Sequence, residues 1–198
     1  MVRRAARNRA EHVHQLVDGD DRPHDVVGVD EGEELAAGGL DPAGLSARFM
    51  STIRRMAAIR FREATFDDCA LIFAWANDPA TRANSARTDM IEWDGHVGWF
   101  REKLADPAAE IWIVTDERGE PAGQVRFDRD AGDDARAEIG VMVDAERRGG
   151  GIGTQIIQTG TAEYIARHPG VTVVAYIRHH NVASQRAFMR AGYVPDGE

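Results

Sequence analysis

Cysteine and long apolar runs are scarce or missing in this chain of 198 residues. Cys69 is the only cysteine, so no disulfide can form within the chain, and we expect a reducing, cytoplasmic compartment. No run of about 18 apolar residues occurs, which argues against a membrane-spanning helix and a membrane partner. The N-terminus is rich in arginine but lacks the apolar segment of a secretory signal.

The chain has fewer basic residues than acidic ones, 24 against 33. The formal net charge is −9, and Lys103 is the only lysine. This balance argues against a nucleic-acid partner, which would require a basic surface. It does not exclude a ligand that carries phosphate, because such a site can be local and built from backbone amides. Apolar residues make up 43% of the chain and charged residues 29%, which is typical of a globular protein.

The composition and the hydrophobic periodicity of the sequence change at about residue 57. Residues 1–57 are rich in Asp, Glu, Gly and His, and residues 28–44 show no sustained period of either a strand or a helix. A helix over residues 45–58 is compatible with the pattern. We therefore predict a poorly structured N-terminal extension over 1–57, followed by one folded domain over 58–198.

From residue 59 onward, residues typical of helix ends and turns recur at regular intervals. Thr65, with an acid three positions later, is typical of a helix start. Leu71, Ile72 and Trp75 then follow on one helical face. Glycine-containing turns between the next strands favour antiparallel hairpins. The patterns predict a mixed α/β fold, with a mostly antiparallel central sheet flanked by helices: strands over 59–63, 110–115, 123–128, 137–143, 171–177 and 193–194, and helices over 67–77, 94–105, 153–167 and 183–191.

A glycine-rich loop over residues 147–153 lies between a predicted strand and a predicted helix. Backbone N–H groups and the helix dipole make such a position an anion site, and consecutive glycines let a diphosphate approach the amides. Arg148 can add a charge-assisted contact. A tight turn without a ligand is the alternative. No Gly-Lys-Ser/Thr follows, and Ile156 stands where a dinucleotide motif has its third glycine, so coenzyme A remains among the phosphate ligands.

Two motifs together resemble the signatures of the GNAT superfamily of N-acetyltransferases. The first is Arg148-x-x-Gly151-x-Gly153, preceded by the strand Glu138-Ile139-Gly140-Val141-Met142-Val143. The second is Asn181-x-x-Ser184-x-x-x-Phe188-x-x-x-Gly192-Tyr193, which follows the strand over 171–177. The resemblance covers residues 59–193, and it implies a GNAT fold and an enzyme that uses acetyl-CoA as co-substrate.

In that family the strands that carry Val141 and Tyr176 splay apart, and the pantetheine arm pairs with backbone groups in the gap. A backbone N–H near Met142 would stabilise the oxyanion formed when an amine attacks the thioester. The resemblance therefore implies the following cofactor-binding residues: Val141, Met142, Val143, Arg148, Gly149, Gly150, Gly151, Ile152, Gly153, Thr154, Asn181, Ser184 and Phe188.

The sequence departs from the family pattern in two places. Many members have a tyrosine at the position of Phe188, and its phenol reprotonates the leaving thiolate. A thiol with a pKa near roughly 8.5 is a tolerable leaving group without that help. Tyr176 or Tyr193 could substitute, although core positions are the simpler interpretation for both. Only five residues follow Tyr193, whereas the family usually continues into a further strand or hairpin.

The region that normally builds the acceptor side resembles one branch of the family, which acetylates UDP-linked amino-dideoxy sugars in pseudaminic acid biosynthesis. The similarity consists of Trp-x-Asn-Asp, an arginine, and His-x-x-Trp-Phe over residues 75–100. Aromatic faces could hold uracil or sugar, and arginines could meet a nucleotide phosphate. Core packing is the alternative, and it is the favoured one for Trp75. The predicted substrate-binding residues are Trp75, Asn77, Arg82, Trp99 and Arg126.

The amine must lose a proton before it attacks, and Glu138 and His96 are the candidate catalytic bases, although each could be structural. No ligand set is spaced for a metal, so we expect none. Three hypotheses remain for the function. They are acetylation of the amine of a UDP-linked 4-amino sugar, acetylation of another amine such as a protein N-terminus or a small metabolite, and a non-catalytic sensor that binds acyl-CoA. A homodimer remains open.

Overall fold

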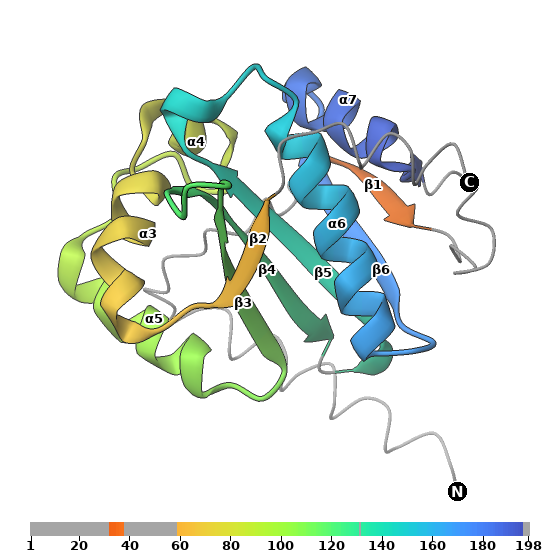
Figure 1. Ribbon diagram of the computed structural model, residues 1–198, viewed down its shortest axis with the longest axis horizontal. Helices are drawn as coiled ribbons and strands as arrows, with labels where there is room; N and C mark the ends of the chain where they lie inside the picture. Colours follow the sequence, from red (N-terminus) through yellow and green to blue (C-terminus); the bar gives the residue numbers. More distant parts are fainter. Residues whose placement is uncertain (1–31, 38–58, 131, 196–198) are drawn as a thin grey trace, which may run out of the picture.

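The computed structural model describes residues 32–37, 59–130 and 132–195, and it has a mixed α/β architecture, as predicted. One sheet contains the strands in the order β2-β3-β4-β5-β6-β1-β7 (Figure 1). All neighbouring strands are antiparallel except β5 and β6, which run parallel. The strands are β1 (Gly32–Ala37), β2 (Arg60–Glu63), β3 (Ala109–Thr115), β4 (Pro121–Asp130), β5 (Asp133–Val143), β6 (Thr172–Arg178) and β7 (Val194–Pro195).

Helices cover both faces of the sheet. An apolar cluster that includes Val125, Phe127 and Ile139 packs against α6 and α7, and a second cluster around Trp99 and Ile113 packs against α3 and α5. Alternate residues of each central strand therefore face opposite layers. The helices are α3 (Cys69–Ala76), α4 (Pro79–Asn84), α5 (Trp93–Ala105), α6 (Ile152–Arg167) and α7 (Val182–Ala191), with short 3₁₀ turns η1 (Phe66–Asp68) and η2 (Ala145–Arg147).

The first predicted helix start is confirmed in its chemistry. Asp68 accepts a hydrogen bond from the Thr65 backbone N–H at 2.8 Å, and Arg62 binds both Asp68 oxygens at 2.8 and 2.6 Å. The chain there forms η1 and then α3, which ends one residue before the predicted end. The helix α4 was not predicted. Its only local signals are Asp78, whose side chain accepts from two backbone N–H groups, and Pro79 at the first helical position.

The parallel pair of strands is short. Residues Arg136–Glu138 of β5 pair with Thr172–Val174 of β6, and the two strands then separate, although β5 continues to Val143 and β6 to Arg178. This confirms the splay that the GNAT resemblance implied. Backbone groups along the separated ends face a gap rather than a neighbouring strand, and buried groups of this kind need another partner.

The strand β1 lies within the segment that we predicted to be poorly structured, and that prediction is wrong for residues 32–37. All six residues pair antiparallel with β6, and Leu35 and Ala36 also pair with β7. A strand inserted at this position is held through backbone hydrogen bonds, which require no period in the sequence. The rest of the predicted extension, including the helix expected over 45–58, lies outside the described residues.

The strand β1 pairs with the outer edge of β6 along all six of its residues and separates β6 from the two-residue β7. We expect a chain that begins at residue 40 to melt at least about 5 °C below a chain that begins at residue 30, because six strand residues lose their pairing. Thermal unfolding followed by circular dichroism compares the two. Equal melting temperatures would show that β1 adds nothing to the stability of the domain.

Candidate active site

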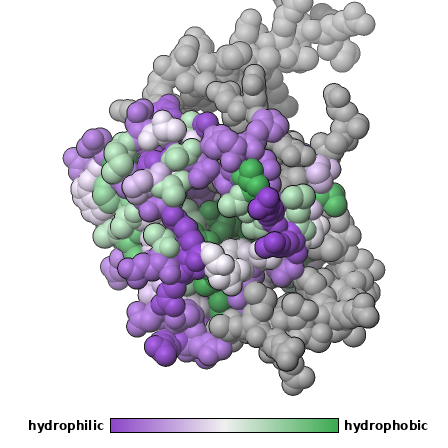
Figure 2. Space-filling view, turned by 90° about the horizontal axis from the view of Figure 1, so that it is seen from above, coloured by the Kyte–Doolittle hydropathy of each residue, from purple (hydrophilic) through white to green (hydrophobic). Residues whose placement is uncertain are grey.

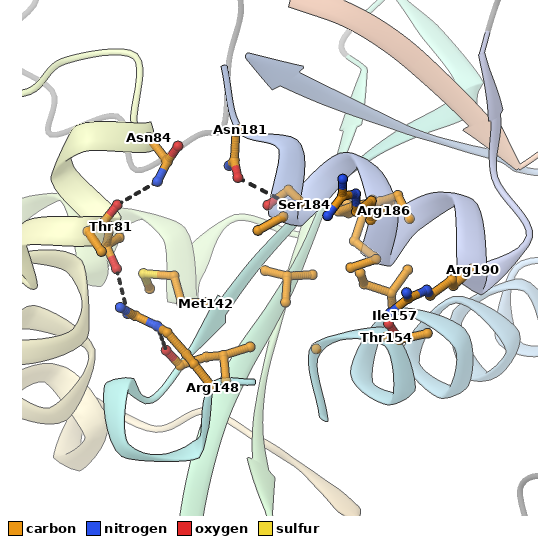
Figure 3. A pocket seen from close by; sticks show the side chains of 18 of the residues that line it. Thr81, Asn84, Met142, Arg148, Thr154, Ile157, Asn181, Ser184, Arg186 and Arg190 are labelled. Carbon is orange, nitrogen blue, oxygen red and sulfur yellow. Dashed lines mark hydrogen bonds between the residues drawn. The ribbon is translucent and has the colours of Figure 1, made fainter. Parts of the chain in front are cut away.

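A cavity of about 490 Å³ lies where β5 and β6 separate. Figure 3 shows the side chains of α4 on one side of this cavity and those of α6 and α7 on the other. Figure 2 looks onto this end of the molecule, where apolar surface lies at the bottom of a hollow rimmed by polar residues. The lining residues are Ala80, Thr81, Asn84 and Ser85; Ile139, Val141, Met142 and Val143; Arg148, Gly149, Gly151, Gly153, Thr154 and Ile157; and Tyr176, Asn181, Ala183, Ser184, Arg186, Ala187, Phe188 and Arg190.

The glycine loop forms one wall of the cavity, as predicted. Gly149 and Gly151 both have φ of 85°, a left-handed conformation that favours glycine, and Gly151 is the N-cap of α6. The free backbone N–H groups at the start of a 16-residue helix favour an anion at this position. Gly150 and Ile152 were also predicted to bind the cofactor, but neither lines the cavity, and Ile152 packs against the core on the α6 side.

Trp75 of α3, on the other face of the sheet, holds the turn before this loop in place. The Nε1 of Trp75 donates to Asp144 Oδ2 at 2.8 Å, and the other oxygen of Asp144 accepts from the Glu146 backbone N–H at 2.8 Å. Trp75 is buried. The structure therefore places Trp75 in the core, where it fixes the turn before the glycine loop, and not on an acceptor.

Arg148 lines the cavity but is engaged by α4. Its Nη1 is 2.6 Å from Asp78 Oδ1, and its Nε donates to the Val143 carbonyl at 3.1 Å. Its Nη2 donates to Thr81 Oγ1 at 3.1 Å (Figure 3). The guanidinium thus joins the glycine loop to the N-terminus of α4, and the predicted contact with a phosphate stays a prediction.

The second predicted motif surrounds the other side of the cavity. Asn181 caps α7 by accepting from the Ser184 backbone N–H at 3.1 Å. Phe188 is buried and packs edge-on against Tyr193, with ring centroids 4.9 Å apart. The Tyr193 hydroxyl bonds to Thr161 Oγ1 at 2.7 Å, and burial raises its pKa far above the ordinary value, so Tyr193 is poorly placed to supply a proton.

Some lining residues were not found from the sequence. Arg186 and Arg190 lie one helical turn apart on α7 and bring positive charge to the side of the cavity that also contains Thr154 (Figure 3). Their spacing of four residues was the available signal. Tyr176 also lines the cavity, and its hydroxyl accepts from Arg136 Nη2 at 2.9 Å.

Two of the predicted substrate-binding residues hold the loop that follows α4. Arg82 is 4% exposed, and its guanidinium donates to the Ala76 carbonyl at 2.7 Å and to Ser85 Oγ at 2.8 Å. The side chain of Asn77 clamps Ile91 by donating to its carbonyl at 3.0 Å and accepting from its N–H at 2.8 Å. Both side chains direct their hydrogen-bonding groups to partners inside the protein, so they are badly placed to contact a nucleotide phosphate.

His96 and Trp99 lie in an aromatic layer between α3 and α5. His96 is 0% exposed, its Nε2 is 3.1 Å from the Cys69 carbonyl oxygen, and its ring stacks on Phe100. Trp99 is buried beside it, with ring centroids 5.5 Å apart. A base must reach the amine or a water next to it, and an enclosed imidazole does not. The structure thus gives His96 and Trp99 packing roles instead of the predicted catalytic and substrate contacts.

Glu138 has a different environment. One of its carboxylate oxygens is fully buried and has no hydrogen-bond partner within residues 59–130 and 132–195. Burial is the main cause that raises its pKa, to about 7, with Asp128 acting in the same direction and Arg126 in the opposite one. Arg126, predicted to bind substrate, is 2% exposed and forms an ion pair with Asp128 at 2.6 Å. The pKa of Glu138, at about 7, is suited to proton transfer at neutral pH.

Comparison with known proteins agrees with this geometry. The sequence profile of the acetyltransferase (GNAT) domain matches residues 58–194. The chain belongs to the GNAT acetyltransferase family. It is an acetyl-CoA-dependent N-acetyltransferase, and acetyl-CoA is its co-substrate.

The relatives span several acceptors. A Bacillus subtilis (strain 168) protein, YwnH, described as a candidate phosphinothricin acetyltransferase, is 26% identical over 132 residues, which are 65% of this chain and 78% of that protein. Two solved structures share the fold. The aminoglycoside acetyltransferase AAC(6')-Ib with coenzyme A has a TM-score of 0.62 and 20% identity, over 71% of this chain and 86% of that one. The spermidine N-acetyltransferase of Vibrio cholerae with CoA and spermine has a TM-score of 0.60 and 15% identity, over 70% and 82%.

Among the described residues, no helix combines the length and apolar character needed to cross a bilayer.

The cofactor assignment predicts that Gly151→Asp weakens acetyl-CoA binding by at least about tenfold, because it places a side chain at φ of 85° and adds a like charge beside a phosphate. Gly150→Ala is the matched control, since a Cβ at Gly150 meets no atom within 4 Å. Isothermal titration calorimetry measures both. If Gly151→Asp binds acetyl-CoA as the parent does, the diphosphate is held elsewhere.

Proposed function

We propose that this enzyme acetylates the primary amine of a small acceptor that does not carry several positive charges, and that Glu138 is the general base. The observation that carries the proposal is the environment of Glu138, whose buried oxygen has no hydrogen-bond partner among the described residues. Glu138 does not itself line the cavity, but its strand β5 does through Ile139 and residues 141–143, so the proton passes to Glu138 through a water molecule. A carboxylate with a pKa of about 7 can both exist ionised and accept a proton at neutral pH.

The proposed reaction is a direct transfer of the acetyl group to the amine. Glu138 takes one proton from the ammonium of the acceptor through a water molecule, and the free amine attacks the thioester carbonyl carbon. The new C–N bond gives a tetrahedral oxyanion, for which a backbone N–H near Met142 is the candidate donor. The C–S bond then breaks, and the nitrogen releases its second proton to water as the amide forms. Phe188 has no proton to give, so CoA leaves as a thiolate, which is tolerable for a thiol with a pKa near roughly 8.5.

The charges around the cavity bear on the acceptor. Arg186 and Arg190 line it, Arg148 lines it while paired with Asp78, and no carboxylate is part of the lining among the described residues. A polycation such as spermidine or an aminoglycoside would gain little from such a lining, whereas an acceptor that carries a carboxylate, phosphinate or phosphate would not be repelled. We therefore place amino-acid-like acceptors, such as the phosphinothricin named for the Bacillus relative, ahead of polyamines.

A UDP-linked 4-amino sugar, the finer prediction from the sequence, also has this negative character. Its support is now limited to the sequence pattern over residues 75–100, because Arg82, Trp99 and Arg126, which suggested nucleotide contacts, are buried. Acetylation of a protein N-terminus and a silent acyl-CoA sensor are the alternatives that the same assay separates.

A panel of acceptors tests the charge argument. We expect phosphinothricin or a UDP-4-amino sugar to have a kcat/KM at least about tenfold above those of spermidine, kanamycin and a peptide with a free N-terminus. Release of the CoA thiol reports turnover, and calorimetry with acetyl-CoA alone checks that each preparation binds the cofactor. Preference for the polycations would refute the charge argument, and cofactor binding without thiol release for any amine would favour the sensor.

The base assignment makes a separate prediction. The carboxylate form is the active one, so kcat/KM of the parent should fall as the pH drops through about 7. Glu138→Gln should remove this acidic limb and lower kcat/KM by about a hundredfold. Glu163→Gln, on the exposed side of α6, is the control and should keep the limb. An unchanged limb in Glu138→Gln means that another group is the base.

A further inference from the structure

A set of charged side chains lies on the face of the sheet that packs against α5. Arg126 and Asp128 come from β4, Glu138 from β5 and Lys103 from α5. In the antiparallel register Asp128 is directly opposite Glu138, and Arg126 is directly opposite Gly140. Directly opposite residues on antiparallel strands share one face, with Cβ atoms about 5 Å apart. The register alone therefore places the ion pair beside the proposed base.

The guanidinium of Arg126 is held in one place. Its Nε is 2.6 Å from Asp128 Oδ2, and its Cζ lies 5.3 Å from the centre of the Trp99 ring. A Cβ built on Gly140 would lie 3.9 Å from Arg126 Nη2, so the guanidinium reaches across β5 at the one residue that has no side chain. This position is between Glu138, two residues earlier, and Met142, two residues later on the same face.

The counter-charges of this set are shared. Asp128 is bound by two cations, because its other oxygen is 2.7 Å from Lys103 Nζ. Asp106, 3.5 Å from Lys103 Nζ, also offsets the Lys103 charge. Asp128 is thus the carboxylate paired with Arg126, and an ionised Glu138 adds a second negative charge beside the guanidinium. A charge that is 2% exposed, as Arg126 is, is costly without such compensation.

We propose that Arg126 is a positioning residue for acetyl transfer: fixed over Gly140 by Asp128 and Trp99, it maintains Glu138 as the carboxylate that accepts the proton of the amine. The inference rests on the proposed role of Glu138 as the base. It assigns to Arg126 an electrostatic action through Glu138 in place of a contact with the acceptor.

Four charged groups of the described residues act on the pKa of Glu138. Arg126 and Lys103 lower its pKa, Asp128 raises it, and Arg136, two residues earlier on β5, lowers it. On β6 the register partner of Glu138 is Val174, which carries no charge. Loss of the Arg126 charge must therefore move the pKa of Glu138 upward, and loss of the Asp128 charge must move it downward.

The test uses the acidic limb of the kcat/KM profile of the full chain, measured with its best acceptor. We expect Arg126→Met to move the limb to higher pH by at least about one unit, and Arg126→Lys to return it to within about 0.3 unit of the parent. Asp128→Asn should move the limb to lower pH. The KM for acetyl-CoA should change by less than about twofold in all three variants, because neither residue lines the cofactor cavity.

Opposite shifts for the two charge-removing variants separate electrostatic control from a structural role. A structural ion pair would lower kcat or the melting temperature in both variants and leave the limb at the pH of the parent, and that result overturns the proposal. If Arg126→Met does not yield folded protein, the direction of the Asp128→Asn shift decides. Glu138→Gln is measured in parallel. If its kcat/KM still falls at acidic pH as in the parent, the assignment of Glu138 as the base has failed. If only the Arg126 and Asp128 variants leave the pH of this fall unchanged, the base assignment stands and the role of Arg126 has failed.

Discussion

The separation of β5 from β6 is the constraint around which the other features of the molecule are arranged. The two strands pair over three residues and then diverge, so a cleft opens in the middle of the sheet with backbone groups along both sides. Such groups must find partners, and an extended molecule with its own amides is a natural one. The glycine loop follows β5 and the Asn181 cap follows β6, so each strand leads directly into one wall of the cofactor cavity. An open sheet is stable here because its outer edge is paired with β1 and both faces are covered by helices (Figure 1).

Local motifs in the sequence located the glycine loop and the Asn181 cap on either side of the cavity. Glycines with left-handed φ and a helix N-terminus are consecutive in the chain, so their geometry follows from residues a few positions apart. The acceptor side was different. Tryptophan, histidine and arginine at helical spacing look the same whether they face a ligand or the interior, and here Trp75, His96 and Trp99 face the interior. Arg82 satisfies carbonyls of a loop whose path could not be known without the fold.

The strand β1 and the helix α4 were missed for related reasons. A strand recruited to a sheet edge needs only its backbone, so the residues at 32–37 carried no periodic signal. The helix α4 is too short to show a period, yet it supplies Thr81, Asn84 and Ser85 to the cavity and the Asp78 that anchors Arg148. The short helix α4, which shows no period, thus completes the site.

The pairing of β1 with β6 also has a consequence for the way the chain folds. Gly32 meets Arg178, so two segments near opposite ends of the polypeptide become neighbours. Ribosomes add about 5–20 residues per second, so β1 leaves the ribosome on the order of ten seconds before its partner. During synthesis it must wait unpaired while the hairpins of β3, β4 and β5, which join residues close in sequence, are already able to form. The pairing of β1 with β6 is therefore formed last. Until then β6 is joined to the sheet by only three residues of β5, and its other edge is open to pairing with another chain.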